Sequence, residues 1–304
     1  MKNVKESAAQ TAPKIARVAL GNILVPTDFS PSADHALDYA LAIARLYDSR
    51  IYLAHVLTPD AYAFVPPDAA VTTQGTLRQA SEERLAEILI SGRMRGIPHE
   101  VILEEGFLWP TIEKLLRKYE IDMVVVGTHG AKKVEKFFLG SGAEEIFRRA
   151  ECPVMTVGPR FTGELARSAV WKNILFATDL EHPPERAAAY ALSLAQEYQS
   201  HLTILNVLDR HGEPTGRDGA ALRAELLGRL EKAVPTATAL WCEAEFELRF
   251  GSPADEILRV AHDKNSDLIV MGAHAGSGLA THNPFAKTYR VIREAACPVL
   301  TVKQ

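Results

Sequence analysis

The sequence predicts an α/β protein of two tandem domains, each a doubly wound sheet of five parallel strands. The first observation is an internal repeat, because "NILVPTDFSPSADHALDYALAIARLYDS" from Asn22 aligns without a gap with "NILFATDLEHPPERAAAYALSLAQEYQS" from Asn173. The second is that short apolar runs alternate with helical patterns, which indicates a parallel sheet covered by helices on both faces. The third is length, since 304 residues are long for one such domain and suit two of about 150.

The repeat also closes in the same way in both halves. "DMVVVGTHG" followed by "CPVMTV", ending at Val157, matches "DLIVMGAHA" followed by "CPVLTV", ending at Val302. We therefore divide the chain into a flexible N-terminal tail, a first repeat, a linker and a second repeat. These segments are residues 1–18, 19–160, 161–170 and 171–304.

The first repeat begins with a short β-branched run, Ile23–Val25, which predicts a buried strand. The turn that follows ends in Ser30 and Pro31, residues suited to the N-cap and the first position of a helix. An apolar face then recurs at helical spacing through Leu37, Ala40, Leu41 and Ala44.

The rest of the repeat continues the alternation of strand and helix. A long loop rich in Pro and Ala is expected at 58–75, between the second strand and the second helix. The remaining strands are predicted at 51–57, 99–106, 122–127 and 153–158, and the remaining helices at 76–95, 109–118 and from about Ser141.

Composition and charge limit the classes of function. Apolar residues make up 47% of the chain and charged residues 24%, which is typical of a soluble globular protein. The net charge of −4 gives no reason to expect nucleic acid or an anionic membrane as a partner. No apolar stretch approaches the roughly 20 residues of a membrane span, and the N-terminus lacks the apolar core of a secretory signal. The three cysteines lack metal-site spacing, so a reducing cytoplasm is the expected location.

A glycine-rich segment follows the fourth predicted strand of the first repeat. Its glycines are Gly127, Gly130, Gly140 and Gly142. In doubly wound sheets, ligands bind at the carboxyl ends of strands where the strand order reverses. If the first and fourth strands are neighbours, Asp28 and Gly127 lie on either side of the crevice between their carboxyl ends.

The chemistry of this segment indicates an anion such as phosphate. Glycines allow close approach of a ligand to the backbone, and the start of the helix at Gly140 and Ser141 offers unpaired N–H groups. Ser141 adds a hydroxyl, and Lys132, Lys133 and Lys136 make the loop basic. The alternative is structural, because glycines also end strands and begin helices, and the three lysines also suit a solvated loop.

With its spacing taken into account, the sequence resembles the universal stress protein family of UspA-like domains. The nucleotide-binding members of that family carry Gly, two residues, Gly, nine residues, Gly and then Ser or Thr. Gly127, Gly130, Gly140 and Ser141 match this pattern in full, and "NILVPTD" and "CPVMTV" are also similar to the family. The resemblance covers both repeats and implies the strand order 3-2-1-4-5.

The resemblance also implies the ligand and the roles of individual residues. The ligand would be ATP, with ADP and AMP as alternatives and Mg²⁺ as a companion ion. Asp28 would lie beside the adenosine end and Val56 would contact adenine through its backbone, although a turn role for Asp28 and core packing for Val56 stay open. The ribose and phosphates would be held by Gly127, His129 and Gly130 and by Gly140, Ser141 and Gly142, with His129 contributing backbone rather than acting as a catalytic base.

The second repeat departs from this pattern. Gly272 and Asp179 are retained, but Ala275 replaces the second glycine, and Phe285 and Ala286 replace the glycine and serine at the helix start. We therefore expect one nucleotide site per chain, in the first repeat, with the second repeat as a structural partner. Gly276 and Gly278 leave a shifted anion site in the second repeat as an alternative.

The closing strands predict how the two repeats associate. Each would lie at the edge of its sheet, and an exposed apolar edge must be covered. We expect residues 153–157 to pair with 298–302 within the chain, as a pseudo-dimer, with Cys152 and Cys297 as buried thiols at opposite ends of the pairing. A homodimer of the whole chain and protein partners stay open.

The function implied is that of an ATP-binding regulatory protein of the stress response. One alternative is a slow ATP hydrolase, although the sequence offers no nucleophile–base arrangement, no "GxxxxGK[ST]" segment and no carboxylate cluster beyond Asp28. Weak ATPase activity is therefore the most that we expect. The other alternative is a nucleotide-free interaction scaffold.

Overall fold

The computed structural model describes residues 18–59, 67–128, 140–158, 171–179, 185–209, 216–233, 244–273 and 285–303. The predicted linker, and the predicted tail up to residue 17, lie outside these ranges. Val18, the last residue of the predicted tail, donates its backbone N–H to Ser193 Oγ of the second repeat at 2.9 Å.

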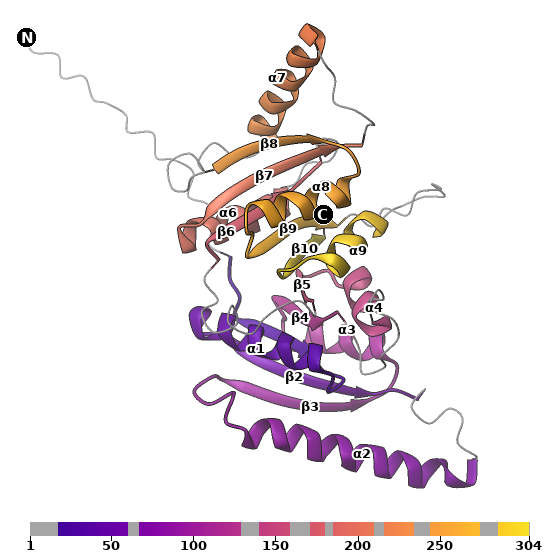
Figure 1. The fold of residues 1–304 in the computed structure, drawn as a ribbon. Helices are drawn as coiled ribbons and strands as arrows, with labels where there is room; N and C mark the ends of the chain where they lie inside the picture. The colour runs from indigo at the N-terminus through magenta and orange to yellow at the C-terminus, as the bar shows by residue number, and fades with distance from the viewer. Residues whose placement is uncertain are drawn as a thin grey trace, which may run out of the picture.

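One sheet of ten strands runs through both repeats (Figure 1), in the order β3-β2-β1-β4-β5-β10-β9-β6-β7-β8. The first repeat contains β1 (Asn22–Pro26), α1 (Pro31–Tyr47), β2 (Arg50–Leu57), α2 (Pro67–Ile90), β3 (His99–Glu105), α3 (Leu108–Lys118), β4 (Met123–Gly127), α4 (Ser141–Arg149) and β5 (Val154–Val157). The second contains β6 (Asn173–Ala177), α6 (Glu185–Tyr198), β7 (His201–Leu208), α7 (Gly216–Ala233), β8 (Ala244–Phe250), α8 (Pro253–Asp263), β9 (Leu268–Ala273), α9 (Phe285–Glu294) and β10 (Val299–Lys303).

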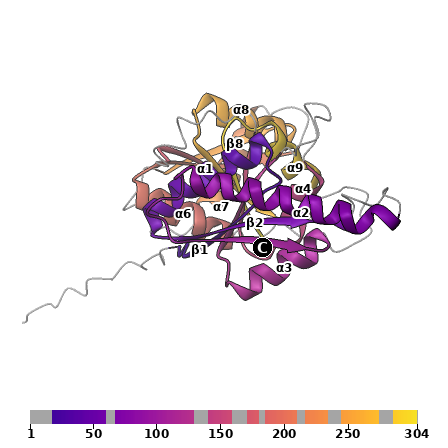
Figure 2. The same ribbon diagram turned by 90° about the horizontal axis from the view of Figure 1, so that it is seen from below.

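The strand order 3-2-1-4-5 predicted for the repeats is confirmed in both of them. Strands pair in parallel within each repeat, as the alternation of strands and helices requires. Alternate side chains of a strand face opposite sides of the sheet. Ile23 and Val25 accordingly belong to the core under α1, and Leu24 to the core under α3 and α4. Figure 2 shows α1 and α3 on opposite sides of β1 and β2.

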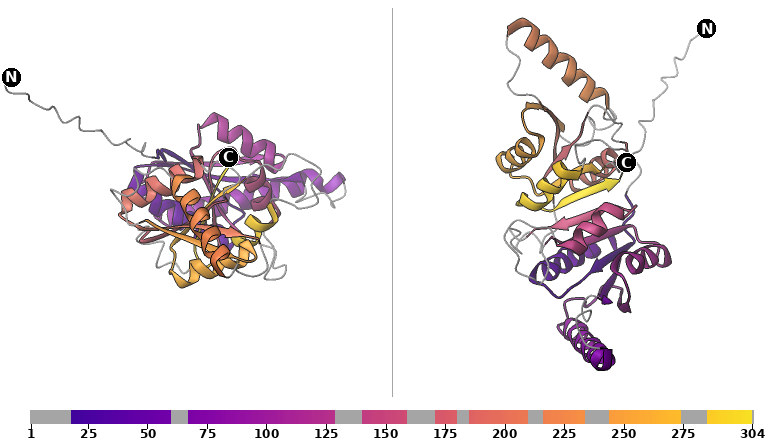
Figure 3. Two further views of the ribbon diagram at one scale, coloured as in Figure 1. Left: turned by 90° about the horizontal axis from the view of Figure 1, so that it is seen from above. Right: turned by 90° about the vertical axis from the view of Figure 1, so that its right-hand side faces the viewer.

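The two repeats meet through β5 and β10, which pair antiparallel with Met155 opposite Leu300. Thr156 Oγ1 and Thr301 Oγ1 donate across the junction to Val299 O at 3.2 Å and Val154 O at 3.0 Å. The predicted intrachain pairing is therefore confirmed. It leaves β3 and β8 as the outer strands, with α2 and α7 at opposite ends of the molecule (Figures 1 and 3).

The two cysteines at this junction are free thiols, as predicted, and Cys297 is buried, but Cys152 is only half-buried, so the predicted burial is wrong for Cys152. The register from Val154↔Thr301 to Thr156↔Val299 places Cys152 beyond one end of the pairing and Cys297 beyond the other. Burial raises the pKa of Cys152 to about 11 and that of Cys297 to about 12, so both are protonated and unreactive near neutral pH.

The second helix of the first repeat differs from its prediction. It was expected at 76–95 after a long loop, but α2 begins at Pro67 and ends at Ile90. Proline fits the first position of a helix, where its missing N–H costs nothing. The predicted C-terminal end is wrong because Gly92 and Gly96 have φ values of 74° and 78°, which a helix cannot include.

Candidate functional site

The candidate site lies where β1 and β4 run side by side and their connections diverge. Leu24 pairs with Val124 in parallel register, so the carboxyl ends of both strands reach the same edge of the sheet. After β1 the chain enters α1, on one face, and the helix that follows β4 is α4, on the other. This is the topological switch point at which doubly wound sheets bind ligands.

The turn after β1 is held by local hydrogen bonds. Ser30 donates its N–H to Asp28 Oδ1 at 3.0 Å, and Ser30 Oγ accepts from Ala33 N–H at 3.2 Å as the N-cap of α1. Pro31 is the first residue of the helix, as predicted. Asp28 is exposed and takes part in this turn, so its structural role is established and its contact with a ligand stays a prediction.

Gly127 ends β4 directly against the first turn of α1. A Cβ atom at this position would lie 2.4 Å from the carbonyl oxygen of Ser32 and 2.8 Å from the nitrogen of Ala33. No side chain fits at such distances, because both neighbours are backbone atoms. Packing therefore requires glycine at 127, whether or not a ligand also approaches it.

The start of α4 is joined to the end of β4. Gly140 donates its N–H to Thr128 O at 2.8 Å, which brings the two ends of the predicted glycine segment together. Gly140 is the N-cap and offers no side-chain cap, so the N–H groups that follow it point out of the helix start. Ser141 is exposed, and Gly142 and Gly140 are half-buried. This arrangement favours an anion.

Val56 lies near the end of β2, opposite Glu104 of β3. It is half-buried and packs against the core under α3 and α4, on the same side of the sheet as α4. Core packing is therefore established for Val56, and its backbone contact with adenine stays a prediction. The predicted ligands His129 and Gly130, and the three loop lysines, lie outside the described residues.

The comparisons with known proteins agree with this fold. The family model described as "Universal stress protein family" matches residues 20–158 and again 171–303. The chain belongs to the universal stress protein family. Among curated relatives, a universal stress protein of Thermus aquaticus is 31% identical over 138 residues, which cover 44% of this chain and all of that protein. One of Methanocaldococcus jannaschii is 27% identical over 136 residues, 44% of this chain and 80% of that protein.

Solved structures extend the similarity to both repeats of this universal stress protein. A universal stress protein of Archaeoglobus fulgidus superposes with a TM-score of 0.70 at 22% identity, over 95% of this chain and 98% of that one. A Pseudomonas aeruginosa protein described as functionally unknown gives 0.61 at 18% identity, over 94% and 93% of the two chains. At such low identity these structures establish the shared tandem fold.

The second repeat of this universal stress protein keeps the first two residues after its first strand and differs at the start of its last helix. Thr178 and Asp179 follow β6 as Thr27 and Asp28 follow β1, but α9 begins at Phe285, where the first repeat has Gly140. Ala275, Gly276 and Gly278 lie outside the described residues. The helix starts of the two repeats therefore differ in sequence at the position that is the glycine N-cap of α4 in the first repeat.

Three side chains around the β1–α1 turn were not predicted from the sequence: Phe29, His55 and Arg84. The ring of Phe29 lies 4.4 Å from that of His55, centroid to centroid, and the Arg84 guanidinium lies 5.7 Å over the Phe29 ring. Nδ1 of His55 lies 2.8 Å from the carbonyl oxygen of Thr27, so Nδ1 carries the proton. Burial lowers the pKa of His55, which favours the neutral ring. A histidine within the apolar strand "IYLAHVL" was the signal available in the sequence.

The described residues of this universal stress protein contain no group of three or more His, Cys, Asp or Glu side chains arranged to hold a metal ion. Among the same residues, no helix combines the length and the apolar character needed to cross a bilayer.

Proposed function

We propose that this universal stress protein binds ATP in its first repeat and has a regulatory role in the stress response. The observation that carries the proposal is the bond from Gly140 N–H to Thr128 O at the switch point. This bond connects the end of β4 to the uncapped start of α4. These two ends flank the segment that has the full glycine–serine spacing. ADP and AMP share the adenosine end and remain alternative ligands.

The described residues fit the two ends of such a ligand. The start of α4 would receive the phosphates through its outward N–H groups and through the exposed hydroxyl of Ser141. The turn at Asp28 and the end of β2 at Val56 would face the adenosine. Mg²⁺ would then accompany the phosphates with water as its other ligands, as this ion commonly does in nucleotide sites.

We place this function in the cytoplasm. Nucleotide is available there, and its reducing conditions keep thiols free. The free thiols of Cys152 and Cys297 at the junction of the repeats support this location.

The first test asks whether nucleotide is bound at all and in which amount. Purified full-length protein is denatured and the released small molecules are identified by mass spectrometry. Nucleotide-free protein is then titrated calorimetrically with ATP and Mg²⁺, and we expect about one site per chain. Two equivalent sites would contradict the assignment to the first repeat, and no binding would favour the nucleotide-free scaffold.

The second test copies the second repeat into the first. The double variant Gly140→Phe, Ser141→Ala places at the start of α4 the residues that the second repeat has at the equivalent positions. We expect it to lose ATP binding while its melting temperature changes little, because both positions are at least partly exposed. Equal losses of affinity and of stability would show that these residues serve folding alone.

A further inference from the structure

The backbone of Phe29 has an unusual conformation for its residue type. Its φ is 62°, in the left-handed region that bulky side chains rarely adopt. Four other described non-glycine residues have positive φ, and each lies just after the end of a helix, where this conformation is common: Asp48, Glu120, Gln199 and Asn265. Phe29 instead lies just before a helix, in the turn that presents Asp28.

The surroundings of Phe29 hold it in this conformation. Its N–H donates to Thr27 Oγ1 at 3.0 Å, and its ring lies between the imidazole of His55 and the guanidinium of Arg84. His55 is itself tied to Thr27 O. A left-handed non-glycine residue costs roughly 1–3 kcal/mol and persists where neighbours compensate, often at functional sites.

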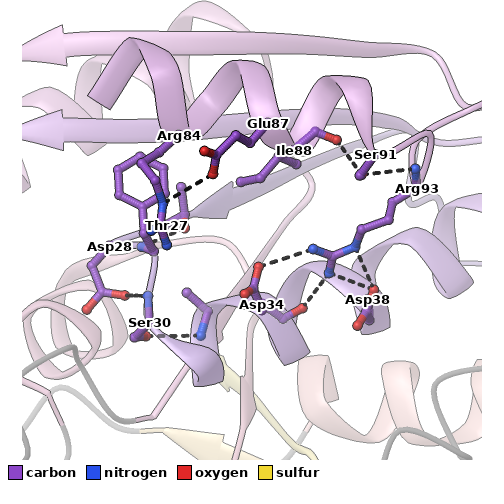
Figure 4. A network of polar contacts seen from close by, with 12 residues as sticks. Thr27, Asp28, Ser30, Asp34, Asp38, Arg84, Glu87, Ile88, Ser91 and Arg93 are labelled. Carbon is purple, nitrogen blue, oxygen red and sulfur yellow. Dashed lines mark hydrogen bonds and ion pairs between the residues drawn. The ribbon is translucent and has the colours of Figure 1, made fainter. Parts of the chain in front are cut away.

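The helix that supplies Arg84 is itself anchored to α1 (Figure 4). Arg93, just beyond α2, donates to Asp34 Oδ1 at 3.1 Å and to Asp38 Oδ1 at 2.7 Å. A hollow of about 180 Å³ is lined by Phe29, Asp34, Arg84 and Arg93, among other residues. Arg84 therefore belongs to a helix whose position relative to α1 is fixed by contacts that do not involve Phe29.

The sequence allows this aromatic contact in the first repeat and not in the second. The second repeat has Leu180 and Asn206 where the first has Phe29 and His55. Asn206 Nδ2 still donates to Thr178 O at 2.9 Å, so the bond to the turn carbonyl is retained without an aromatic ring. The ring pair is thus absent from the repeat that lacks the glycine–serine pattern.

We propose that Phe29, held between His55 and Arg84, is a positioning residue that aims the Asp28 carboxylate at the adenosine end of the bound nucleotide. The inference rests on the proposed function. Asp28 lies between Thr27, whose carbonyl is bonded to His55, and the left-handed residue Phe29, so fixing residue 29 constrains the backbone on both sides of Asp28. Without the ring, residue 29 relaxes toward ordinary φ values and nucleotide binding must then restore the turn, at a cost in affinity.

The experiment measures ATP affinity for the full-length protein, six single variants and one double variant. Phe29→Leu copies the second repeat and Phe29→Tyr keeps the ring; Arg84→Gln removes the cation and Arg84→Lys keeps it. Arg78→Gln is the matched control, because Arg78 lies on the same helix and pairs with Glu105 and Glu82. A double-mutant cycle combines Arg84→Gln with Asp28→Ala.

We expect Phe29→Leu to weaken ATP binding about 2- to 10-fold, the scale of one aromatic contact. Arg84→Gln should weaken it about 2- to 5-fold, the scale of an exposed cation–π contact. Phe29→Tyr, Arg84→Lys and Arg78→Gln should retain the wild-type affinity. In the Asp28→Ala background, Arg84→Gln should have no further effect, because Arg84 acts through the position of that carboxylate.

The outcomes separate the two proposals. If the wild-type protein does not bind ATP, the proposed function is wrong and this inference falls with it. If the wild-type protein binds ATP and Phe29→Leu and Arg84→Gln bind equally well, only the positioning role is overturned. Additive losses for Arg84 and Asp28 would also overturn it, since they would indicate that Arg84 affects binding independently of Asp28.

Discussion

At Gly127 the backbone of β4 approaches the backbone of α1 too closely for any side chain. Ser32 O would lie 2.4 Å from an added Cβ, a distance that real Cβ atoms essentially never show. The first glycine of the nucleotide pattern thus has a packing role in this protein. Its presence alone is therefore weaker support for a ligand than the start of α4.

Gly127→Ala should lower the free energy of unfolding by about 1–3 kcal/mol, as overpacking of a closely packed site does. Chemical denaturation of the full-length protein measures this change. Gly75→Ala is the control, because no atom lies within 4 Å of its added Cβ and it lies inside α2, where alanine is the better helix former. A Gly127→Ala protein as stable as wild type would mean that α1 moves away at little cost.

His55 makes stability depend on pH in a predictable direction. Burial lowers its pKa below the ordinary value of about 6.5, and the hydrogen bond to the Thr27 carbonyl and the nearby Asp28 carboxylate oppose this only in part. As pH falls through about 6.5, the unfolded chain takes up a proton that the folded protein resists, so stability decreases. The contribution is present above that pH and is lost below it.

His55→Asn should reduce this loss of stability, because asparagine does not titrate and Asn206 makes the same bond in the second repeat. The measurement is the denaturation midpoint of both proteins at about pH 7.5 and about pH 5.5, on either side of the ordinary histidine pKa. The other histidines are common to both proteins and cancel in the comparison. An equal drop in both proteins would exclude His55 as the titrating group.

Among the elements, α4 shows most directly how local sequence sets the charges and the capping at the two ends of a helix. Its N-cap is a glycine with no side-chain cap, and its last turn carries Arg148 and Arg149. The basic residues at its C-terminal end match the helix dipole, and the start is left open for an anion. α2 is a different case, since it lies mostly on the surface and contacts the β1–α1 turn through Arg84.

Ser141→Ala should weaken ATP binding by about 0.5–1.5 kcal/mol, the value of one hydrogen bond from a neutral hydroxyl. Folding should not change, because the side chain is exposed. Calorimetric titration measures the affinity, and Ser252→Ala, an exposed serine at the N-cap of α8, is the control. Unchanged affinity would show that the hydroxyl does not reach the phosphates.

At the scale of the whole molecule, the two repeats complete one another's sheet. All four residues of β5 are buried, and their pairing with β10 turns two edge strands into interior ones. Helix packing adds to this, because Tyr47 of α1 donates its hydroxyl to Glu197 Oε2 of α6 at 2.8 Å, and the buried Trp171 donates to the Tyr39 hydroxyl. These contacts show that the second repeat packs against the first over both the sheet and the helices.

A fragment of residues 1–160 should keep ATP binding and should self-associate. Asp28 and the glycine segment lie within it, and its uncovered β5 can pair with a second copy. Light scattering measures the mass and calorimetric titration the affinity, with the full-length protein as reference. A monomeric fragment would contradict the edge-pairing argument. An associated fragment that does not bind ATP would show that the second repeat contributes to the pocket.

Much of the fold follows from local sequence. The strands at Ile23–Val25 and 122–127 and the cap at Ser30 are confirmed, because β-branched runs and N-cap residues act through their own neighbours. The extent of α2 was missed at both ends. Its Pro- and Ala-rich start resembles a loop, and its end depends on backbone angles at Gly92 and Gly96.

The sequence by itself determined the repeat, the alternation of strands and helices, and the one intact glycine–serine spacing, because each is written in consecutive residues. Only the tertiary structure decided that Gly127 serves packing, since Ser32 is distant in the chain. It also decided that Phe29 lies between His55 and Arg84. Contacts between such separated residues depend on how β1, β2 and α2 pack together, and no local sequence pattern predicts them.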